Sequence, residues 1–274
     1  MSALSPTSPN DAVLDALEEE SIFALREAYA RLKPMAMLWS IGKDSNTLLW
    51  LVRKAFLGRV PFPVMLLDTG NEFAEVYAFR DLMIREWKLE YINAICPPVE
   101  ATDPSLPPNA RAAARKTLGL AEAIVRFGLR GVLFWIRRDE QPIRSKERMF
   151  SPRSAAGNWD FRHQPVELWG HYQTDVAHGA HVRVHPLLSW TEIDVWRYIR
   201  RENIPVVPLY FARAGWRYRS LGESDITHPI RSSAGTVDEI VAELEKTNEP
   251  ERAGRSMDHE SEDAFERLRT AGYM

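Results

Sequence analysis

The stretch that decides the fold is Met35-Ala-Met-Leu-Trp-Ser-Ile-Gly-Lys-Asp-Ser45, which runs into a helix-like segment at residues 46–56. Its apolar first half predicts a buried strand, and the turn behind it leads directly into the helix. At such a junction the free backbone N–H groups and the positive end of the helix dipole point toward one position, where an anion binds. Gly42 lets the backbone approach closely, and Lys43 adds a positive charge. The sequence therefore predicts a phosphate-binding loop.

The spacing of this loop separates it from two common phosphate loops. No Gly-x-x-x-x-Gly-Lys-Ser/Thr pattern occurs in the chain, and the loop is not a dinucleotide fingerprint. Residues 40–45 instead resemble the Ser-Gly-Gly-x-Asp-Ser loop of the PP-loop ATP pyrophosphatases, with Ile41 where the first glycine usually stands. That resemblance implies cleavage of ATP between its α and β phosphates. A plain strand-turn-helix junction with a serine cap would look similar, so other motifs must decide.

Composition limits the class of protein. The chain has 274 residues, of which 45% are hydrophobic, enough for one α/β domain with an appendage. A net charge of −3 argues against nucleic acid as the main partner. The single cysteine, Cys96, excludes a disulfide framework and a cysteine-rich metal site. Neither a signal peptide nor an apolar run of the roughly 18 residues needed to span a bilayer is evident, so we expect a cytoplasmic protein that binds no membrane.

The order of apolar segments predicts how the chain is organised. Strand candidates at 35–39, 63–68, 89–95 and 131–136 alternate with helical patterns. This alternation predicts an α/β fold, a mostly parallel sheet with helices on both faces. We expect a disordered Ser/Pro-rich N-terminus at 1–10, a PP-loop ATP-binding domain at 11–212, and a partly helical C-terminal extension at 213–274.

Polar residues follow three of the predicted strands. They are Ser40–Ser45, then Asp68-Thr69-Gly70, then Arg137-Arg-Asp-Glu140. Because ligands of parallel sheets bind outside the carboxyl ends of the strands, we expect these groups to share one polyphosphate pocket. Lys43 and the arginines would neutralise its charge, and Asp44 or Asp68 would be available for Mg²⁺. Simpler interpretations stay open: a turn cap at Asp68, a helix cap at Asp44, and a solvated surface at 137–140.

Over most of its length the chain resembles the ATP sulfurylase small-subunit family (sulfate adenylyltransferase subunit 2), in the PAPS reductase-like branch of the PP-loop superfamily. The shared motifs, in chain order, are Leu38-Trp-Ser-Ile-Gly-Lys-Asp-Ser45, Leu67-Asp-Thr-Gly70, Lys116-Thr117, Arg137-Arg-Asp-Glu140, Arg144-Ser-Lys-Glu-Arg148, Glu167-Leu-Trp169, Arg183-Val-His-Pro-Leu187, Trp190-Thr-Glu-Ile-Asp-Val-Trp196, Pro208-Leu-Tyr-Phe211, Arg217-Tyr-Arg-Ser-Leu-Gly222 and Glu251-Arg-Ala-Gly-Arg255. Eleven motifs in the same order are far more specific than one loop.

The resemblance implies a reaction and a set of site residues. The reaction is ATP plus sulfate giving adenosine 5′-phosphosulfate and pyrophosphate, with Mg²⁺, in sulfate assimilation. The implied partner is a GTPase large subunit on a separate chain. The residues expected to bind ATP are Trp39, Ser40, Gly42, Lys43, Asp44, Ser45, Asp68, Thr69 and Gly70. The residues expected in catalysis are Lys43, Asp44, Arg137 and Arg138. The substrate anion is assigned to Arg144, Lys146 and Arg148, and Mg²⁺ to Asp44 and Asp68.

One departure from the family bears on substrate choice. Phe134-Trp135 stands where the family commonly has a pair of glycines, so two rings would reshape the pocket. The alternatives are therefore adenylation of a different acceptor and a non-catalytic or interaction subunit. A thiol-dependent reductase is disfavoured, because residues 253–274 carry no cysteine.

Histidines cluster in the middle of the chain. Five of the seven fall between residues 163 and 185. No carboxylate or cysteine joins them at a recognised ligand spacing, so we expect solvent-exposed loop histidines rather than a metal centre.

Overall fold

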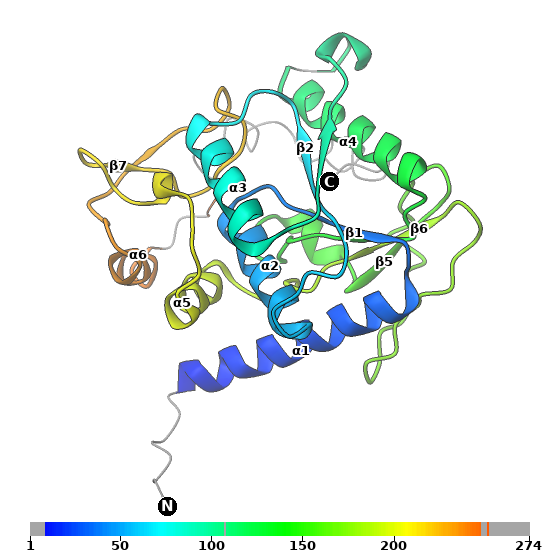
Figure 1. Cartoon of the computed structure of the whole chain (residues 1–274), viewed down its shortest axis with the longest axis horizontal. Helices are drawn as coiled ribbons and strands as arrows, with labels where there is room; N and C mark the ends of the chain where they lie inside the picture. Colours follow the sequence, from blue (N-terminus) through cyan, green and yellow to red (C-terminus); the bar gives the residue numbers. More distant parts are fainter. Residues whose placement is uncertain (1–8, 107, 248–250, 252–274) are drawn as a thin grey trace, which may run out of the picture.

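In the computed structural model, which describes residues 9–106, 108–247 and 251, six strands form one sheet in the order β3-β2-β1-β4-β6-β5 (Figure 1). The strands are β1 (Met35–Leu38), β2 (Val64–Asp68), β3 (Tyr91–Ile95), β4 (Gly131–Leu133), β5 (Phe150–Arg153) and β6 (His181–Val184). Only β5 runs antiparallel to its neighbour in this described sheet. The predicted mostly parallel sheet is confirmed.

Helices cover both faces of this sheet. They are α1 (Pro9–Arg31), α2 (Lys43–Ala55), α3 (Ala74–Trp87), α4 (Pro108–Phe127), α5 (Glu192–Glu202) and α6 (Val237–Leu244). Short 3₁₀ turns lie at Val99–Ala101 (η1), Pro142–Lys146 (η2) and Pro208–Tyr210 (η3), and a small hairpin joins β7 (Trp216–Arg217) to β8 (Ile230–Arg231). The predicted helix near 117–127 is longer than expected. It begins at Pro108, because a proline is tolerated at the first helical position and the alanine- and arginine-rich residues after it favour a helix.

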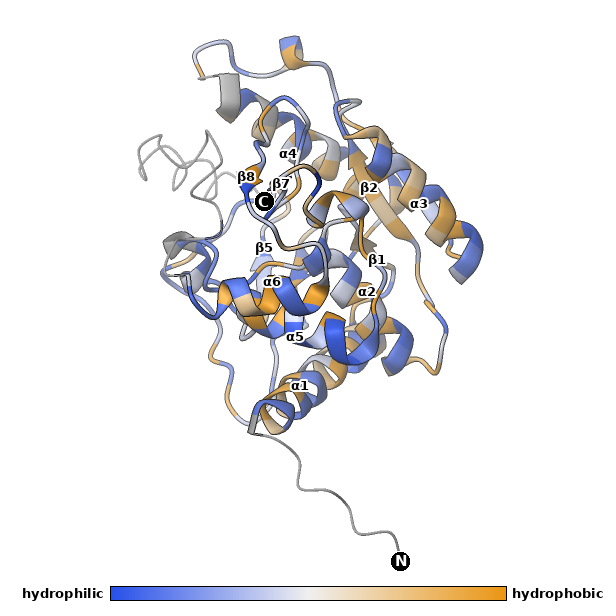
Figure 2. Ribbon diagram, turned by 90° about the vertical axis from the view of Figure 1, so that its left-hand side faces the viewer, coloured by the Kyte–Doolittle hydropathy of each residue, from blue (hydrophilic) through white to orange (hydrophobic). Residues whose placement is uncertain are grey.

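Side chains of the central strands alternate between two cores. On β1, Met35 and Met37 join the core formed with α1, α2, α3, α5 and α6, whereas Ala36 and Leu38 join the core under α4. Every residue of β1 is buried, as expected for a strand covered on both faces. In Figure 2, most of β2 is hydrophobic, while α1 and α5 carry hydrophilic residues as well.

The sheet order creates a crevice at the end of β1. The chain lays β2 and β3 on one side of β1 and then returns to place β4 on the other side. The carboxyl ends of β1 and β4 therefore diverge at a topological switch point, where ligands of such sheets bind. The loop at residues 39–42 and the first turn of α2 lie there.

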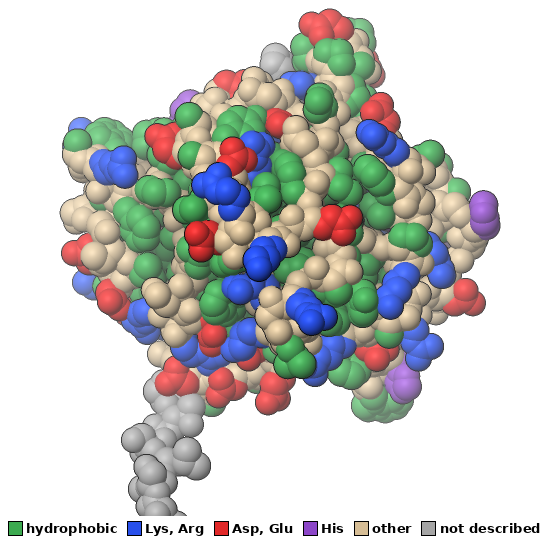
Figure 3. All heavy atoms as spheres, in the orientation of Figure 1, with side chains coloured by type: hydrophobic (Ala, Val, Ile, Leu, Met, Phe, Trp, Pro, Cys, Tyr) green, Lys and Arg blue, Asp and Glu red, His purple; other side chains and the backbone are tan. Residues whose placement is uncertain are grey.

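The surface and the chain ends add two facts. On the face in Figure 3, acidic and basic side chains of the described residues are interspersed. None of the helices in the described part of the chain is long and apolar enough to cross a membrane. The expected disorder at 1–10 falls mainly on residues 1–8, outside the described residues, and α1 already begins at Pro9. The proposed boundary at 212 stays a prediction.

The expectation of exposed histidines is wrong for two of the five. His181 and His185 are buried, with 3% and 1% of their surface exposed, because the buried strand β6 begins with His181 and leads directly into His185. Burial lowers the pKa of His181 to about 3 and that of His185 to about 4, so both are neutral near pH 7. His163, His171 and His178 are exposed as expected. Among the described residues, no three potential ligands lie close enough to hold a metal ion.

These buried histidines predict a loss of stability in mild acid. The unfolded chain takes up a proton at each site near pH 6.5, but the folded chain does so only near pH 3 to 4. The free energy of unfolding should therefore fall as the pH drops from about 6.5, by roughly 1.4 kcal/mol per pH unit for each histidine. The free energy of unfolding, measured by urea denaturation at several pH values between 7 and 5, should fall less steeply with decreasing pH for His185→Gln than for the native chain. The exposed His178→Gln serves as control, and an identical slope for His185→Gln would contradict the account.

Candidate phosphate-binding site

The loop after β1 folds back onto the first turn of α2. The buried Trp39 indole donates from Nε1 to Asn46 Oδ1 at 2.7 Å, and the Ser45 hydroxyl donates to the Gly42 carbonyl at 3.0 Å. Gly42 is the N-cap of α2 and makes no side-chain cap, since it has no side chain. Ser45 and Asn46 thus hold the loop from behind. The amino end of α2 faces the cavity, which Gly42, Lys43 and Asp44 line.

Ile41 has a backbone conformation that a β-branched residue rarely adopts. Its φ is 63°, in the left-handed region, and its side chain is completely buried. The loop geometry requires this conformation, and the glycine that the PP-loop pattern has at this position would adopt it without strain. A branched residue there costs roughly 1–2 kcal/mol, which the burial of its side chain offsets. Backbone strain of this kind is typical of functional loops.

Two cations from distant parts of the chain meet at the loop. Lys43 Nζ lies 3.1 Å from Asp44 Oδ2 and also contacts the Glu251 carboxylate. Arg137, four residues after the end of β4, contacts Asp44 through Nη1 and Asp139 through Nε at 2.9 Å. Burial lowers the pKa of Arg137, but the surrounding carboxylates outweigh this and raise it above its usual value. Both side chains are almost fully buried, and their carboxylate partners hold them in place.

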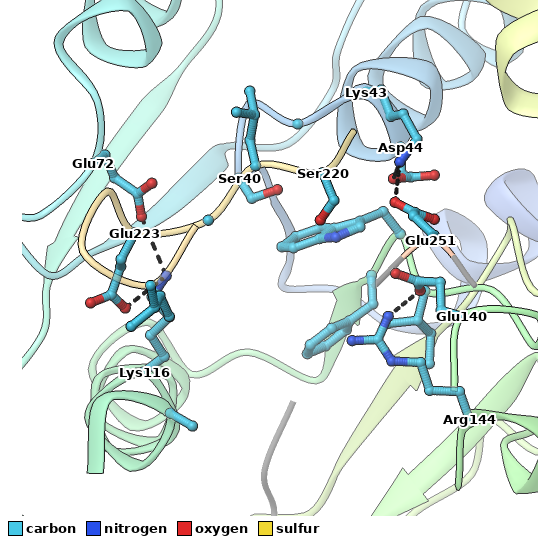
Figure 4. Close-up of a pocket in the computed structure, with 18 of the residues that line it drawn as sticks. Ser40, Lys43, Asp44, Glu72, Lys116, Glu140, Arg144, Ser220, Glu223 and Glu251 are labelled. Carbon is cyan, nitrogen blue, oxygen red and sulfur yellow. Dashed lines mark hydrogen bonds and ion pairs between the residues drawn. The ribbon is translucent and has the colours of Figure 1, made fainter. Parts of the chain in front are cut away.

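A cavity of about 150 Å³ opens beside this cluster (Figure 4). Ser40, Gly42, Lys43 and Asp44 line it at the loop, and Arg144, paired with Glu140, lines it on the same side. At its other end Lys116 lies 3.3 Å from Glu72 and 3.2 Å from Glu223. Figure 4 shows these two charged groups on opposite sides, with Ser40 and Ser220 between them. The cavity is therefore elongated and charged at both ends.

The structure brings together only part of the predicted site. Ser40, Gly42, Lys43, Asp44 and Arg144 line the cavity, while Trp39, Ser45 and Arg137 are buried behind it. The remaining predicted residues are not among those that line it. They are Asp68, Thr69, Gly70, Arg138, Lys146 and Arg148.

Asp68 illustrates why a predicted ligand lies elsewhere. Its carboxylate accepts hydrogen bonds from the Tyr77 hydroxyl at 2.7 Å, the Gly70 backbone at 2.9 Å and Asn93 at 3.2 Å. Burial raises the pKa of this carboxyl, but the hydrogen bonds outweigh it and the net pKa is lowered. The Gly70 contact is the turn cap that the simpler interpretation of Asp68 expected.

The two rings after β4 both line the cavity but differ in burial. Phe134 is buried, with the Arg183 guanidinium 5.0 Å from its ring centroid and the His185 ring packed edge-on. Trp135 is only half-buried and stacks on Phe134 with centroids 6.4 Å apart. Two aromatic side chains thus form this part of the cavity wall.

Sequence reasoning missed four contributors to the site. Tyr210, in η3, accepts the Lys43 backbone N–H at 2.8 Å and orients the first turn of α2. Glu251 enters the cluster, and Glu72 pairs with Lys116 across the far end. Tyr210, Lys116 and Glu251 all lie within motifs shared with the family, and that was the available signal. Nothing in the local pattern indicates what they contact.

Known proteins share this fold and these motifs. The model of the phosphoadenosine phosphosulfate reductase domain family matches residues 34–229. Sulfate adenylyltransferase subunit 2 of Rhizobium tropici is 39% identical over 98% of this chain and 95% of its own. The chain belongs to the sulfate adenylyltransferase subunit 2 family. Its member from Pseudomonas aeruginosa (strain LESB58) is 37% identical over 95% of this chain and 97% of its own.

A solved structure supports the fold. The FMN adenylyltransferase of Candida glabrata, in complex with FAD and inorganic pyrophosphate, superposes with a TM-score of 0.58 at 15% identity. The alignment covers 92% of this chain and 91% of that one. At this identity the likeness concerns the fold alone.

The strained loop predicts an inverted order of stability for two variants. In ordinary backbone, glycine is less stable than alanine by roughly 0.5–1 kcal/mol. At Ile41 the positive φ removes this disadvantage, so Ile41→Gly should be more stable than Ile41→Ala by about 1 kcal/mol, although both lose the buried side chain. Urea denaturation of both variants measures this. The matched pair Val132→Gly and Val132→Ala, in strand β4, should keep the ordinary order. A more stable Ile41→Ala would contradict the strain argument.

Proposed function

We propose that this protein is the ATP-cleaving subunit of a sulfate adenylyltransferase, which forms adenosine 5′-phosphosulfate and pyrophosphate from ATP and sulfate. The observation that carries the proposal is the placement of Lys43 and the amino end of α2 in one cavity at the switch point of the sheet. Both features favour polyphosphate. Family membership supplies sulfate as the acceptor, through the name of its members.

The chain's residues would act by positioning and charge neutralisation. A sulfate oxygen attacks the α-phosphorus in line, the bond from that phosphorus to the bridging oxygen breaks, and the β,γ-pyrophosphate leaves with the electron pair. Sulfate is already a dianion at neutral pH, so the site needs no general base. Lys43, the N–H groups of α2 and Arg137 would hold the departing pyrophosphate, where negative charge accumulates. Arg144, on the same side of the cavity, would contribute a further positive charge.

Magnesium fits this site as an ion that arrives with the nucleotide. The described residues offer no cluster of three ligands, and Mg²⁺ typically uses one or two carboxylates plus phosphate oxygens and water. Asp44 lines the cavity and would be its carboxylate, whereas Asp68 lies outside the lining. When bound, Mg²⁺ neutralises phosphate charge and stabilises the leaving group.

A thiol-dependent reductase fits the structure poorly, although the matching family model carries that name. Such chemistry needs a reactive thiolate. Cys96 is the only cysteine of the chain and is 4% exposed. Burial raises the pKa of its thiol to about 11, so it is protonated at neutral pH.

A second chain and a cytoplasmic location complete the proposal. The relatives are named as one subunit of an enzyme, which supports a partner for this chain. We propose a GTPase large subunit, because formation of the phosphosulfate anhydride is uphill and needs a second source of free energy. The single buried cysteine suits the reducing cytoplasm.

Pyrophosphate release tests this function directly. Purified chain with ATP and Mg²⁺ should release pyrophosphate only when sulfate is present, with adenosine 5′-phosphosulfate as the second product. Addition of a GTPase subunit and GTP should increase the yield. Release that depends on a different oxyanion would assign another acceptor. No release under any condition, from a chain that still binds ATP, would favour a non-catalytic subunit.

Two adjacent arginines provide a matched pair of variants. Arg137 is buried in the charge cluster, whereas Arg138 is exposed and contacts Ser189 at 3.2 Å. Arg137→Lys keeps the charge but loses the forked contacts to three carboxylates, so it should lower kcat/KM for ATP at least tenfold. Arg138→Lys should change it less than about threefold. Equal losses of kcat/KM in both variants would show that Arg138 also takes part in the reaction.

A further inference from the structure

Glu251 is the one described residue of the chain beyond residue 247, and its carboxylate lies in the phosphate site. One oxygen contacts Lys43 Nζ, and the other lies 2.5 Å from Arg137 Nη2. The side chain of Glu251 is only 6% exposed, and those of Lys43 and Arg137 are 1% and 0% exposed. The carboxylate therefore occupies a contact position on both cations that an incoming anion would need.

Carboxylates outnumber cations in this cluster. Lys43, Arg137 and Arg144 face the carboxylates of Asp44, Asp139, Glu140 and Glu251, through contacts that the structure records. Burial raises the pKa of Glu251, but the attraction of Lys43 and Arg137 outweighs it and the net pKa lies well below the usual range. Glu251 is therefore ionised. Three cations against four carboxylates form a poor site for a further polyanion.

Space leads to the same conclusion as charge. The cavity measures about 150 Å³ with Glu251 among its lining residues. Pockets for nucleotide-sized ligands typically measure 300–1,000 Å³. Two carboxylate oxygens on a lysine and an arginine also mimic the contacts that phosphate oxygens would make.

We infer that Glu251 is an internal competitor of polyphosphate: the described conformation is closed, and ATP binds only when its phosphates displace the Glu251 carboxylate from Lys43 and Arg137. The inference rests on the proposed function for the position of the phosphates. The affinity for ATP is then reduced by the fraction of molecules in which Glu251 is displaced. Repulsion between Glu251 and the incoming phosphates disappears when the side chain is made neutral.

The test compares Glu251→Gln and Glu251→Ala with the native full-length chain. The matched control is Glu245→Gln, which removes a half-exposed carboxylate paired with Arg197 outside the cavity. Calorimetric titration with inorganic pyrophosphate, and separately with ATP, gives Kd without any need for turnover. Both Glu251 variants should bind about tenfold or more tightly than the native chain, with Glu245→Gln unchanged.

Thermal unfolding supplies a second readout and guards against misfolding. Without ligand, the Glu251 variants lose the two buried ion pairs with Lys43 and Arg137, so Tm should fall. Saturating pyrophosphate should then raise Tm by more than it does for the native chain. Circular dichroism confirms that the variants are folded, and Glu251→Asp, which keeps the charge, provides a milder variant that should bind no more tightly than the native chain.

The alternative role, a residue that positions Lys43 and Arg137 for catalysis, predicts the opposite. Unchanged or weaker pyrophosphate binding in both Glu251 variants, with a fall in kcat, would overturn the inference. If neither the native chain nor the variants bind pyrophosphate or ATP, the phosphate site itself is wrong, and the proposed function falls with it. Tight binding by the native chain with no gain in the variants overturns the inference alone.

Discussion

The rest of the site depends on one buried set of ion pairs, in which Lys43, Asp44, Arg137 and Glu251 neutralise one another at the end of the central strands. Burying a charge costs several kcal/mol unless partners surround it, and removing one partner leaves the others uncompensated. The stability of the cluster therefore depends on the anion that completes it. The cluster is stable while a carboxylate or another anion completes it, and it favours an anion whenever that carboxylate leaves.

The fold brings these charges together through the order of its strands. Because β4 lies beside β1, Arg137 reaches the loop that follows β1. It contacts Asp44 there, although the two residues are 93 positions apart in the sequence. Tyr210 holds the first backbone N–H of α2, and Ile41 accepts an unfavourable φ so that the turn is tight enough. Each of these contacts lowers the freedom of the loop before any ligand binds. A preorganised loop of this kind acts by electrostatics and position rather than by proton transfer.

Local pattern was enough to predict much of this architecture. The apolar runs located β1, β2, β3 and β4, and the strand-turn-helix junction located Lys43 and Asp44, because these features depend on residues close in sequence. Packing decided the rest. Arg137 and Arg138 look alike in the sequence, yet one is buried in the cluster and the other is exposed. His181 and His185 were expected in loops, but pairing of β6 with β4 and β5 buries them. Glu251 lies 208 residues from Lys43, and no periodicity signals a contact over that distance.

The central claim is that the pyrophosphate part of ATP binds on Lys43 and Arg137. A crystal structure of the full chain with Mg²⁺ and a non-hydrolysable ATP analogue tests it most directly. The account predicts β- and γ-phosphate oxygens within hydrogen-bond distance of Lys43 Nζ and the N–H groups of α2, with the Glu251 carboxylate displaced from both cations. An analogue whose phosphates lie elsewhere in the cavity, while Glu251 still pairs with Lys43 and Arg137, would contradict it.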